Sequence, residues 1–284
     1  MPGTFSDSWK LTKTSFRLIA EDRALLVFPV VAAVSILAVV VLLILGWVFV
    51  AWPLGAGPNG YSTSPSVILA ALVMLVAAYF TMVFISVYCS AALIGAAMLK
   101  LSGQQPTAAD GWRVARSRLG RLLAWSLIAA TVGVLIQLVA SRARGVAGFV
   151  IGAVGGVTWA VVTFFIIPVL LYEDLSAWSS LGRSAKLFTS TFGRTVVSNL
   201  VVGLIIGAGI VGAVVLGVFG LLLFVSSSVV LGLVLIGAGI AVGVIVGLIG
   251  SAAEGVLRAA LYRYATTGKV DPDLVPSAYT VPRF

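Results

Sequence analysis

The sequence predicts an all-α integral membrane protein with about six transmembrane helices. Two observations support this fold class. Of the 284 residues, 61% are hydrophobic and only 10% are charged, whereas a soluble domain carries about 25% charged residues and needs polar cover on its exterior. The apolar residues also fall in runs long enough to cross a bilayer, since a spanning helix takes about 20 of them.

Short polar connections separate the predicted spans. The first run is longer than the apolar part of a signal peptide and no small-residue cleavage motif follows it, so we expect an uncleaved first span. We expect residues 1–268 to form one transmembrane domain and residues 269–284 an extended cytoplasmic tail. The predicted spans are residues 25–52, 67–99, 119–140, 146–172, 195–225 and 229–250.

The basic residues predict the orientation of the chain. Of its 18 Lys and Arg residues, all but Arg142 and Arg144 fall on one side if there are six spans, together with both termini. Because cytoplasmic loops carry the excess of basic residues, we expect both termini in the cytoplasm of a prokaryote, with the chain a multi-pass protein of its plasma membrane. The net charge of +9 is then explained by topology and lipid headgroups, and we expect no nucleic-acid partner.

Three cytoplasmic segments have the pattern of amphipathic helices lying in the headgroup region. Each carries a tryptophan followed by basic residues: Trp9, Trp112 and Trp178. Residues 107–110, Thr-Ala-Ala-Asp, also have the form of a capping box that opens a helix. Each segment precedes a pair of spans, which favours three repeats of an interfacial helix plus a hairpin. Any basic interfacial helix favours tryptophan, however, so both interpretations stay open.

The basic side chains of these segments are the candidate functional surface. We hypothesise that they form a cytoplasmic collar that binds anionic lipid headgroups, since each basic residue near an anionic surface contributes about 1 kcal/mol. The alternative is that these charges only set the orientation during insertion. The collar comprises Lys10, Lys13, Arg17, Arg113, Arg116, Arg118, Arg183 and Lys186.

Glu173 is the candidate functional carboxylate. Ionisable residues inside a span usually mark function, and the predicted span interiors contain none; Glu173 follows span four directly. It is either an interfacial charge or an inward-facing carboxylate that pairs with arginine or binds a cation. Glu254 lies just past span six and is expected to pair with Arg258 at i,i+4 spacing.

Glycines recur at four-residue spacing in the later spans, which forms grooves where helix backbones approach closely. This pattern predicts packing of helices within the chain, and homo-oligomer contact is the alternative. The clearest repeats are Gly148, Gly152 and Gly156 in span four, and Gly239, Gly243 and Gly247 in span six.

The sequence excludes several enzyme classes. It has no histidine, which removes the commonest general base and zinc ligand, and its single cysteine, Cys89, cannot form an internal disulfide. Neither a phosphate-binding GK[ST] motif nor a nucleophile elbow is found. We therefore predict a protein that is not an enzyme, with no catalytic, cofactor or metal site.

The chain also resembles a group of bacterial and archaeal integral membrane proteins catalogued only as a domain of unknown function. The matching landmarks extend over nearly the whole chain, and the resemblance implies a multi-span membrane protein without supplying an activity. They include Ser8-Trp9, Phe28-Pro29, Pro106-Thr107, Asp110-Gly111-Trp112, Trp125, Trp159 to Pro168, Glu173, Arg183-Ser184 and Tyr262 to Gly268.

Two functions remain open. The first is a non-enzymatic membrane protein that engages lipids, anionic ones in particular, or a partner protein. The alternative is a small transporter or channel for a hydrophobic or uncharged substrate, which the absence of a charged site within the spans disfavours.

Overall fold

A computed structural model describes residues 23–51, 56–57, 60–61, 64–142, 146–226 and 228–267. A short turn of helix at Arg23–Leu26 leads into the first long helix, and a π-helical turn at Trp47–Ala51 ends it. Between the first two spans, two short strands pair antiparallel, β1 (Ala56–Gly57) and β2 (Gly60–Tyr61). The α-helices are α2 (Val27–Gly46), α4 (Pro65–Leu101), α5 (Ala108–Ser117), α6 (Leu119–Arg142), α7 (Val146–Val162), α8 (Ile166–Tyr172), α9 (Ala177–Ser226) and α10 (Val229–Thr267).

Six of the described helical segments are long and apolar enough to cross a membrane, which confirms the predicted fold class. Their bounds differ from the predicted spans at the ends: the second, third and sixth segments continue past the predicted apolar run, whereas the fifth begins at Ile206 rather than at residue 195. The segments are Ala24–Phe49, Pro65–Leu101, Leu119–Arg142, Ala147–Tyr172, Ile206–Val225 and Val229–Thr267.

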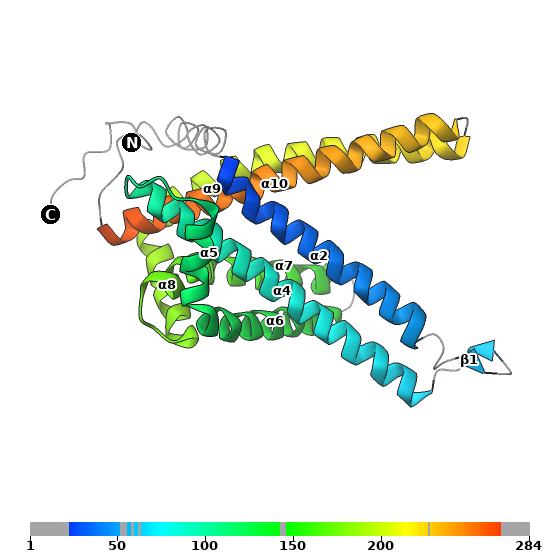
Figure 1. The fold of residues 1–284 in the computed structure, drawn as a ribbon, viewed down its shortest axis with the longest axis horizontal. Coiled ribbons are helices and arrows are strands. Elements are labelled where there is room, and N and C mark those ends of the chain that lie inside the picture. The colour runs from blue at the N-terminus through cyan, green and yellow to red at the C-terminus, as the bar shows by residue number, and fades with distance from the viewer. Residues whose placement is uncertain are drawn as a thin grey trace.

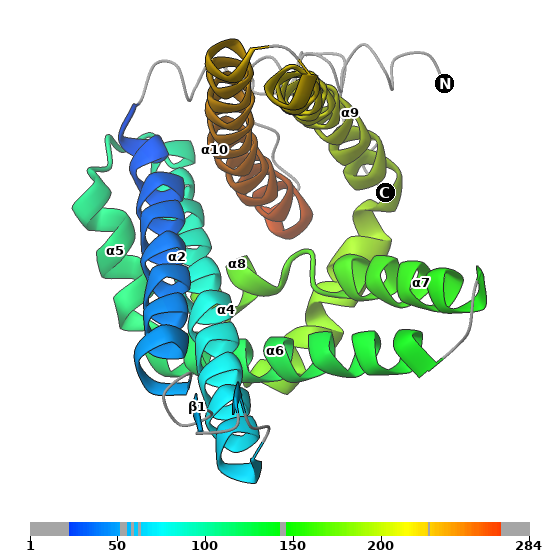
Figure 2. The ribbon, with the colours of Figure 1, turned by 90° about the vertical axis from the view of Figure 1, so that its right-hand side faces the viewer.

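The spans are arranged as three hairpins that leave a common packed end. Figures 1 and 2 show α2 beside α4, α6 beside α7, and α9 beside α10, with the pairs separating away from α5 and α8. Three hairpins agree with the number of predicted repeats. The repeated interfacial helix is found before α6 as α5, whereas no separate helix precedes the third pair, so the repeat itself stays a prediction.

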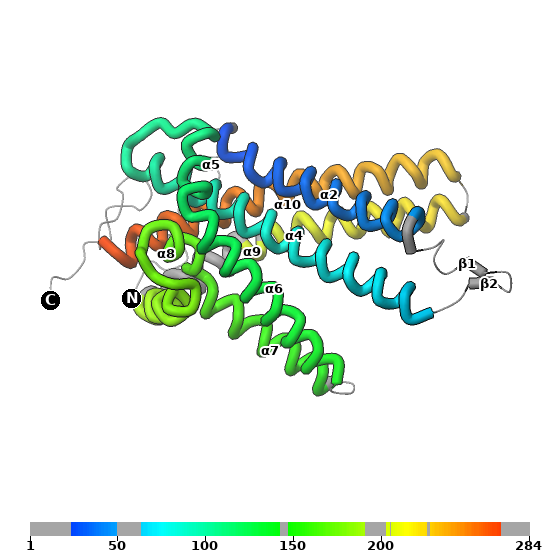
Figure 3. Tube along the Cα trace, turned by 60° about the horizontal axis from the view of Figure 1, so that its bottom comes forward, coloured from blue at the N-terminus to red at the C-terminus, as the bar shows by residue number. Residues whose placement is uncertain are grey.

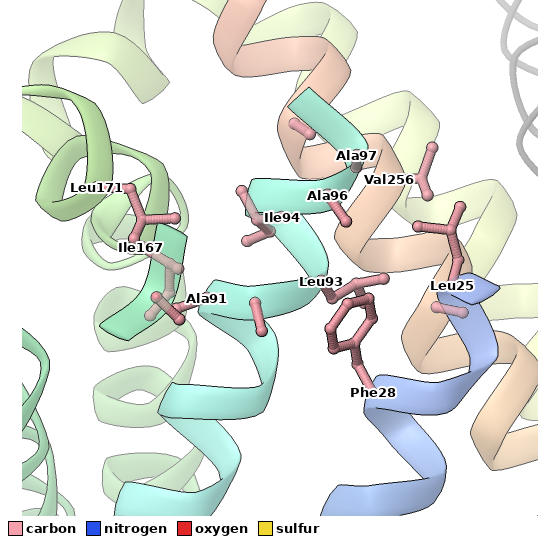
Figure 4. Packing of buried hydrophobic residues seen from close by; sticks show 14 of the residues in the cluster. Leu25, Phe28, Ala91, Leu93, Ile94, Ala96, Ala97, Ile167, Leu171 and Val256 are labelled. Atoms are coloured by element: carbon pink, nitrogen blue, oxygen red, sulfur yellow. The ribbon is translucent and has the colours of Figure 1, made fainter. Parts of the chain in front are cut away.

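We call the packed end the base. There α4 is buried on all sides over seven consecutive residues, Ala91–Ala97, because α2, α5, α8 and α10 all pack against it. Figure 4 shows Leu25 and Phe28 of α2, Ile167 and Leu171 of α8, and Val256 of α10 around this stretch. A second cluster beside it joins α8 and the turn before it to α9 and α10. Its members are Phe164, Phe165, Val169, Leu187, Phe188, Leu257, Leu261 and Tyr262.

Glycines permit the close helix crossings of the base. A Cβ added to Gly111 of α5 would lie 2.6 Å from the carbonyl oxygen of Ala92, and one added to Gly255 of α10 would overlap the side chain of Leu93. Small residues at such crossings let backbones approach, which maximises dispersion contact where lipid supplies no hydrophobic drive. The base is therefore held together mainly by close packing of the other helices against α4.

The amphipathic helix α5 packs on protein rather than lying free in the headgroup region. Its buried residues Gly111 and Ala115 face α4, and the Trp112 ring lies 5.1 Å from that of Phe28 and 5.4 Å from that of Tyr88. This segment therefore differs from the prediction. Its apolar face packs on α4 rather than facing lipid, and its basic side chains are exposed on the surface of the protein.

The prediction of a separate amphipathic helix near Trp178 is wrong. Residues 177–226 form one continuous helix of 50 residues, α9. The stretch between the two predicted elements contains no proline, and a glycine in a helix interior costs only about 1 kcal/mol, so nothing in the chain forces a break. The first predicted amphipathic segment, around Trp9, lies outside the described residues.

α10 extends well past the predicted end of span six at residue 250. Its 39 residues correspond to a length of about 58 Å at 1.5 Å per residue, roughly twice the thickness of the hydrocarbon layer. The extra turns carry the expected Glu254–Arg258 ion pair and supply α10's part of the base. This polar continuation therefore docks on protein instead of ending at the membrane edge.

The α9–α10 hairpin has its own glycine contacts. A Cβ added to Gly239 would lie 2.7 Å from the carbonyl oxygen of Ala213, whereas one added to Gly243 would make an ordinary contact at 3.5 Å with the Ala213 side chain. A Cβ at Gly247, one turn further along, would meet nothing within 4 Å. The four-residue repeat of span six therefore contains three different environments.

We expect Gly239→Leu to lower the thermal stability of the purified protein in detergent. A leucine there must push α9 and α10 apart, and overpacking of a tight contact costs about 1–3 kcal/mol. Gly247→Leu, with the same change in volume and helix propensity, is the control and should melt close to the parent protein. Equal melting temperatures for Gly239→Leu and Gly247→Leu would contradict this packing.

Candidate functional site

Span four is broken inside the base, between α7 and α8. Pro168 has no N–H to donate to the carbonyl of Phe164 one turn earlier, and its ring crowds that carbonyl, so residues 163–165 leave the helix. The hydroxyl of Ser184, on α9, accepts a hydrogen bond from the N–H of Phe165 at 3.0 Å. Backbone freed by the break thus finds a partner within the protein, as it must at the edge of a membrane.

α8 directs two adjacent carboxylates, Glu173 and Asp174, to opposite partners. The helix is buried from Ile166 to Leu171 and ends at Tyr172, and Glu173 that follows has extended backbone. We call Glu173 and Asp174 the acidic link, since they join α8 to α9. In extended chain successive side chains point to opposite sides, and these two carboxylates contact different helices.

Glu173 faces α9 and α10. The Nε of Arg183 donates to both carboxylate oxygens of Glu173, at 2.9 and 3.0 Å, and the hydroxyl of Tyr262 donates to one of them at 3.2 Å. Tyr262 itself is only 4% exposed. Glu173 is therefore the inward-facing, arginine-paired carboxylate that the sequence left as one of its interpretations. Three elements meet at this one side chain.

Asp174 faces the corner between α5 and α6. Arg118 donates from Nη1 to Asp174 at 2.8 Å and from Nε to the carbonyl of Leu171 at 3.2 Å. Arg121 donates from Nη2 to Asp174 at 3.0 Å and from Nη1 to the carbonyl of Glu173 at 3.0 Å. Two arginines thus bind both the carboxylate and the carbonyls at the C-terminal end of α8, where cations are favoured.

These arginines lower the pKa of the Asp174 carboxyl, chiefly through the hydrogen bond from Arg121 and then through that from Arg118. A lowered pKa means that the interaction stabilises the folded chain above the unfolded pKa of aspartate, about 3.9. The contribution disappears as the pH falls through the lower, folded value. At neutral pH the acidic link is therefore fully ionised at Asp174.

A second charged pair lies one turn before Tyr262 on α10. Arg258 pairs with Glu254, and its guanidinium carbon lies 5.2 Å from the centre of the Phe164 ring. The Nε of Arg258 is buried without a hydrogen-bond partner among the described residues. A cation over an aromatic face gains about 0.5–2 kcal/mol. This gain offsets part of the free energy that it costs to bury the Arg258 Nε without a hydrogen bond.

The described residues contain no group of three or more His, Cys, Asp or Glu side chains placed to hold a metal ion. The acidic link is occupied by arginine and tyrosine donors instead. Its chemistry is that of a structural and electrostatic junction, with both carboxylates already satisfied by groups of the protein.

A family model matches residues 67–271, and its description is a family of unknown function, DUF6159. The chain belongs to this family. The DUF6159 match confirms the resemblance to a domain of unknown function, and it includes the acidic link with all of its described partners. No curated protein matches the chain, and no solved structure does.

The predicted collar residues fall into different groups in this DUF6159 structure. Arg118 and Arg183 bind the acidic link, and Arg113 pairs with Asp110 at 2.9 Å. Arg116 and Lys186 are exposed, and no carboxylate pairs with either side chain in the described part of the chain. Lys10, Lys13 and Arg17 lie outside the described residues.

Arg113 and Asp110 belong to the start of α5. The N–H and hydroxyl of Thr107 both donate to Asp110, at 2.9 and 2.7 Å, which confirms the predicted capping box. The hydroxyl contact, followed by the backbone contact, lowers the pKa of the Asp110 carboxyl. This pair stays within α5, so it serves the helix start rather than a junction between elements.

Sequence reasoning missed Asp174, Arg121 and Tyr262 as members of the site. Tyr262 is 89 residues from Glu173, and no local pattern reports a contact at that separation. The sequence does contain a pattern that could have predicted the Asp174 contacts. Asp174 is a carboxylate just after a proline-bearing span, and Arg118 and Arg121 lie three residues apart in another connection. Such spacing places both arginines on one face of a helix turn.

We expect Glu173→Ala to destabilise the protein by about 1–3 kcal/mol, the usual range for leaving a buried hydrogen-bonding group without its partner. The change removes the acceptor of the buried Tyr262 hydroxyl and the counter-ion of Arg183. Thermal unfolding in detergent measures it. Glu254→Ala is the comparison variant: its i,i+4 pair with Arg258 is partly buried but stays within α10, so we expect a smaller loss than for Glu173→Ala, whose partners come from two other helices. A larger loss for Glu254→Ala than for Glu173→Ala would contradict this assignment.

Proposed function

We propose that this is a non-enzymatic membrane protein whose base faces the cytoplasm and binds anionic lipid headgroups. The observation that carries the proposal is the pair of exposed basic side chains, Arg116 and Lys186, on segments that also bear tryptophan. Trp178 is 66% exposed and Trp112 is half-buried. Exposed tryptophan with basic neighbours is typical of a membrane–water interface.

The orientation rests on the distribution of basic residues over the fold. Arg142 ends α6 at the far end of its hairpin, away from the base. The other described basic residues at helix ends belong to segments that meet at the base, and cytoplasmic ends carry the excess of Lys and Arg. They include Arg23, Lys100, Arg113, Arg116, Arg118, Arg121, Arg183, Lys186, Arg258 and Arg263.

The apolar walls of the hairpins support lipid engagement. Side chains far from the base are widely exposed, among them Leu72 at 55%, Val154 at 60% and Val230 at 74%. In water such surface would drive aggregation, whereas in a bilayer acyl chains cover it. Separated hairpins present more of this surface to lipid than a compact six-helix bundle would.

A second copy of the chain is a further partner that we propose for the glycine-bearing face of the α9–α10 hairpin. An apolar groove of about 430 Å³ follows this face, and small residues favour close helix association in lipid. Its lining includes Ala213, Gly217, Gly239 and Gly243, with Ile210, Val214, Ile236 and Ile240 beside them.

The alternative function is a transporter for a hydrophobic or uncharged substrate. The interruption of span four at residues 163–165 favours it, because broken helices line the substrate sites of many transporters. In this protein the break lies within the base and is filled by Phe164 and Phe165, which are 7% and 0% exposed. The filled break makes lipid engagement the better-supported proposal.

The orientation is tested with accessibility tags at Gly60 and Ser227. Gly60 lies between α2 and α4, and Ser227 follows the last residue of α9 in the sequence, so we expect both to be labelled from outside the cell by a membrane-impermeant reagent. Labelling of Gly60 only after the cells are broken open would place the base outside and overturn the proposed topology.

Charge reversal tests headgroup binding. Arg116→Glu with Lys186→Glu should reduce retained anionic lipid at least several-fold by native mass spectrometry, since each lost basic residue removes about 1 kcal/mol of attraction. Arg142→Glu, at the opposite end, is the control and should retain the parent lipid. Higher salt should weaken retention in the parent protein, because screening acts on exposed charges. Unchanged lipid retention in the double variant would contradict headgroup binding by Arg116 and Lys186, and these two charges would then act only in setting the orientation of the chain.

A further inference from the structure

We infer that Tyr79 of α4 and Gln137 of α6 form a hydrogen-bonding site within the bilayer for the carbonyl oxygen of an uncharged, lipid-soluble molecule. The site lies where α6 packs against α4, away from the base. Figure 3 shows α4 and α6 diverging toward the ends that point away from α5 and α8. This site is separate from the headgroup surface proposed above, so either can fail without the other.

Both side chains lie at the level of the hydrocarbon layer. Arg121 and Arg142 enclose the uncharged stretch of α6. At about 1.5 Å per residue these two residues lie about 32 Å apart along the helix, close to the thickness of that layer. Gly133 lies about 14 Å from the Arg142 end, near the middle of the bilayer, and Gln137 lies one turn closer to that end.

Gly133 brings the hydroxyl of Tyr79 against α6. A Cβ added to Gly133 would lie 2.7 Å from the hydroxyl oxygen, closer than real Cβ atoms come to a neighbour, so glycine admits the tyrosine here. Tyr79 is still 38% exposed, and Leu75 and Val76, one turn away on the same face of α4, are 57% and 58% exposed. The hydroxyl therefore lies beside α6 at a place that acyl chains and lipid-soluble molecules can reach.

Gln137 lies one turn beyond Gly133 on the same side of α6. Residues four apart in a helix have Cβ positions about 6 Å apart, and long helical side chains lean back toward the preceding turn. The carboxamide of Gln137 is therefore directed toward the position of the Tyr79 hydroxyl. Gln137 is exposed, so both polar groups are open to the same region of the membrane.

Neither of these polar groups has a hydrogen-bond partner in the described part of the chain. The threonines of the same two helices differ, because each donates to a carbonyl of its own helix. Thr81 donates to Ala77 at 2.7 Å, and Thr131 donates to Leu127 at 2.8 Å. Acyl chains offer no partner, and an unpaired polar group in hydrocarbon is costly. A ligand that brings a polar atom to this depth would remove that cost.

The two side chains define the chemistry of the ligand. A tyrosine hydroxyl and a carboxamide NH₂ both donate, and one carbonyl oxygen can accept from both. Neither α4 before Lys100 nor α6 between its two arginines, Arg121 and Arg142, carries a charged residue, so no side chain there would balance an ionic ligand. Phospholipid headgroups lie at the two interfaces. The carbonyl must therefore belong to a molecule that enters the hydrocarbon layer.

Photolabelling of the full chain in lipid nanodiscs tests the site. The probe is a long-chain ketone with its carbonyl in mid-chain and a photoreactive diazirine beside it; the reference probe is the same chain without the carbonyl. Peptide mapping measures the labelling of α4 and α6. We expect the ketone to label the parent protein more strongly than the reference does. Tyr79→Phe and Gln137→Leu should each reduce this excess about two- to tenfold, the effect of losing one hydrogen bond.

Thr131→Val is the matched control, because it removes a hydroxyl at similar depth whose hydrogen bond stays within α6. It should leave ketone labelling as in the parent protein. Reference labelling should be the same in all variants, which reports that α4 and α6 still pack together. The site is refuted if both probes label the parent equally, since Tyr79 and Gln137 would then bind each other or nothing. It is also refuted if ketone labelling survives both substitutions, falls equally in Thr131→Val, or falls only in parallel with reference labelling.

Discussion

Close approach of helices to one stretch of α4, Ala91–Ala97, is the constraint on which the rest of the structure depends. In a bilayer the spans gain nothing by hiding apolar surface from lipid, so they associate where small residues allow dense packing. α4 offers such a surface on every side, and Gly111 and Gly255 let α5 and α10 reach its backbone and its Leu93. Away from the base the helices pack mainly in pairs, with a contact of α4 and α6 at Tyr79 and Gly133, and the chain divides into three hairpins.

The break in span four follows from the same solvent. Non-helical backbone is tolerated at membrane depth only where protein satisfies it, and residues 163–165 lie inside the base, where Ser184 accepts the Phe165 N–H. The break shortens α8 to seven residues, which leaves its terminal carbonyls in need of donors. Arg118 and Arg121 supply them. Pro168 therefore causes one interruption, and Ser184, Arg118 and Arg121, from separate parts of the chain, hydrogen-bond the backbone on its two sides.

The sequence was sufficient for the features that depend on local pattern. Six apolar stretches, the Thr107–Asp110 capping box and the Glu254–Arg258 pair were predicted correctly, because length, spacing and propensity decide each of them. It was insufficient where contacts between distant segments decide. The continuity of α9 and the Glu173–Tyr262 contact depend on packing at the base, and Pro168 alone did not say whether a kink or a full break would result. The collar was predicted as one set, although ion pairs engage three of its described members: Arg118 and Arg183 through tertiary contacts, and Arg113 within α5.

That division of the collar separates two roles of a basic residue in a membrane protein. The positive-inside rule counts Lys and Arg during insertion and gives acidic residues little weight, so Arg118 and Arg183 contribute to topology regardless of their later partners. Attraction of headgroups by the folded protein depends instead on the local net charge. Arg118, Arg121 and Arg183 share the acidic link, with two carboxylates among three guanidinium groups, so the field they present outward is largely cancelled. Under the proposed function, the charges that orient the chain and those that bind headgroups after folding are therefore not the same set: Arg116 and Lys186 serve in both roles, whereas Arg118 and Arg183 serve only in orientation.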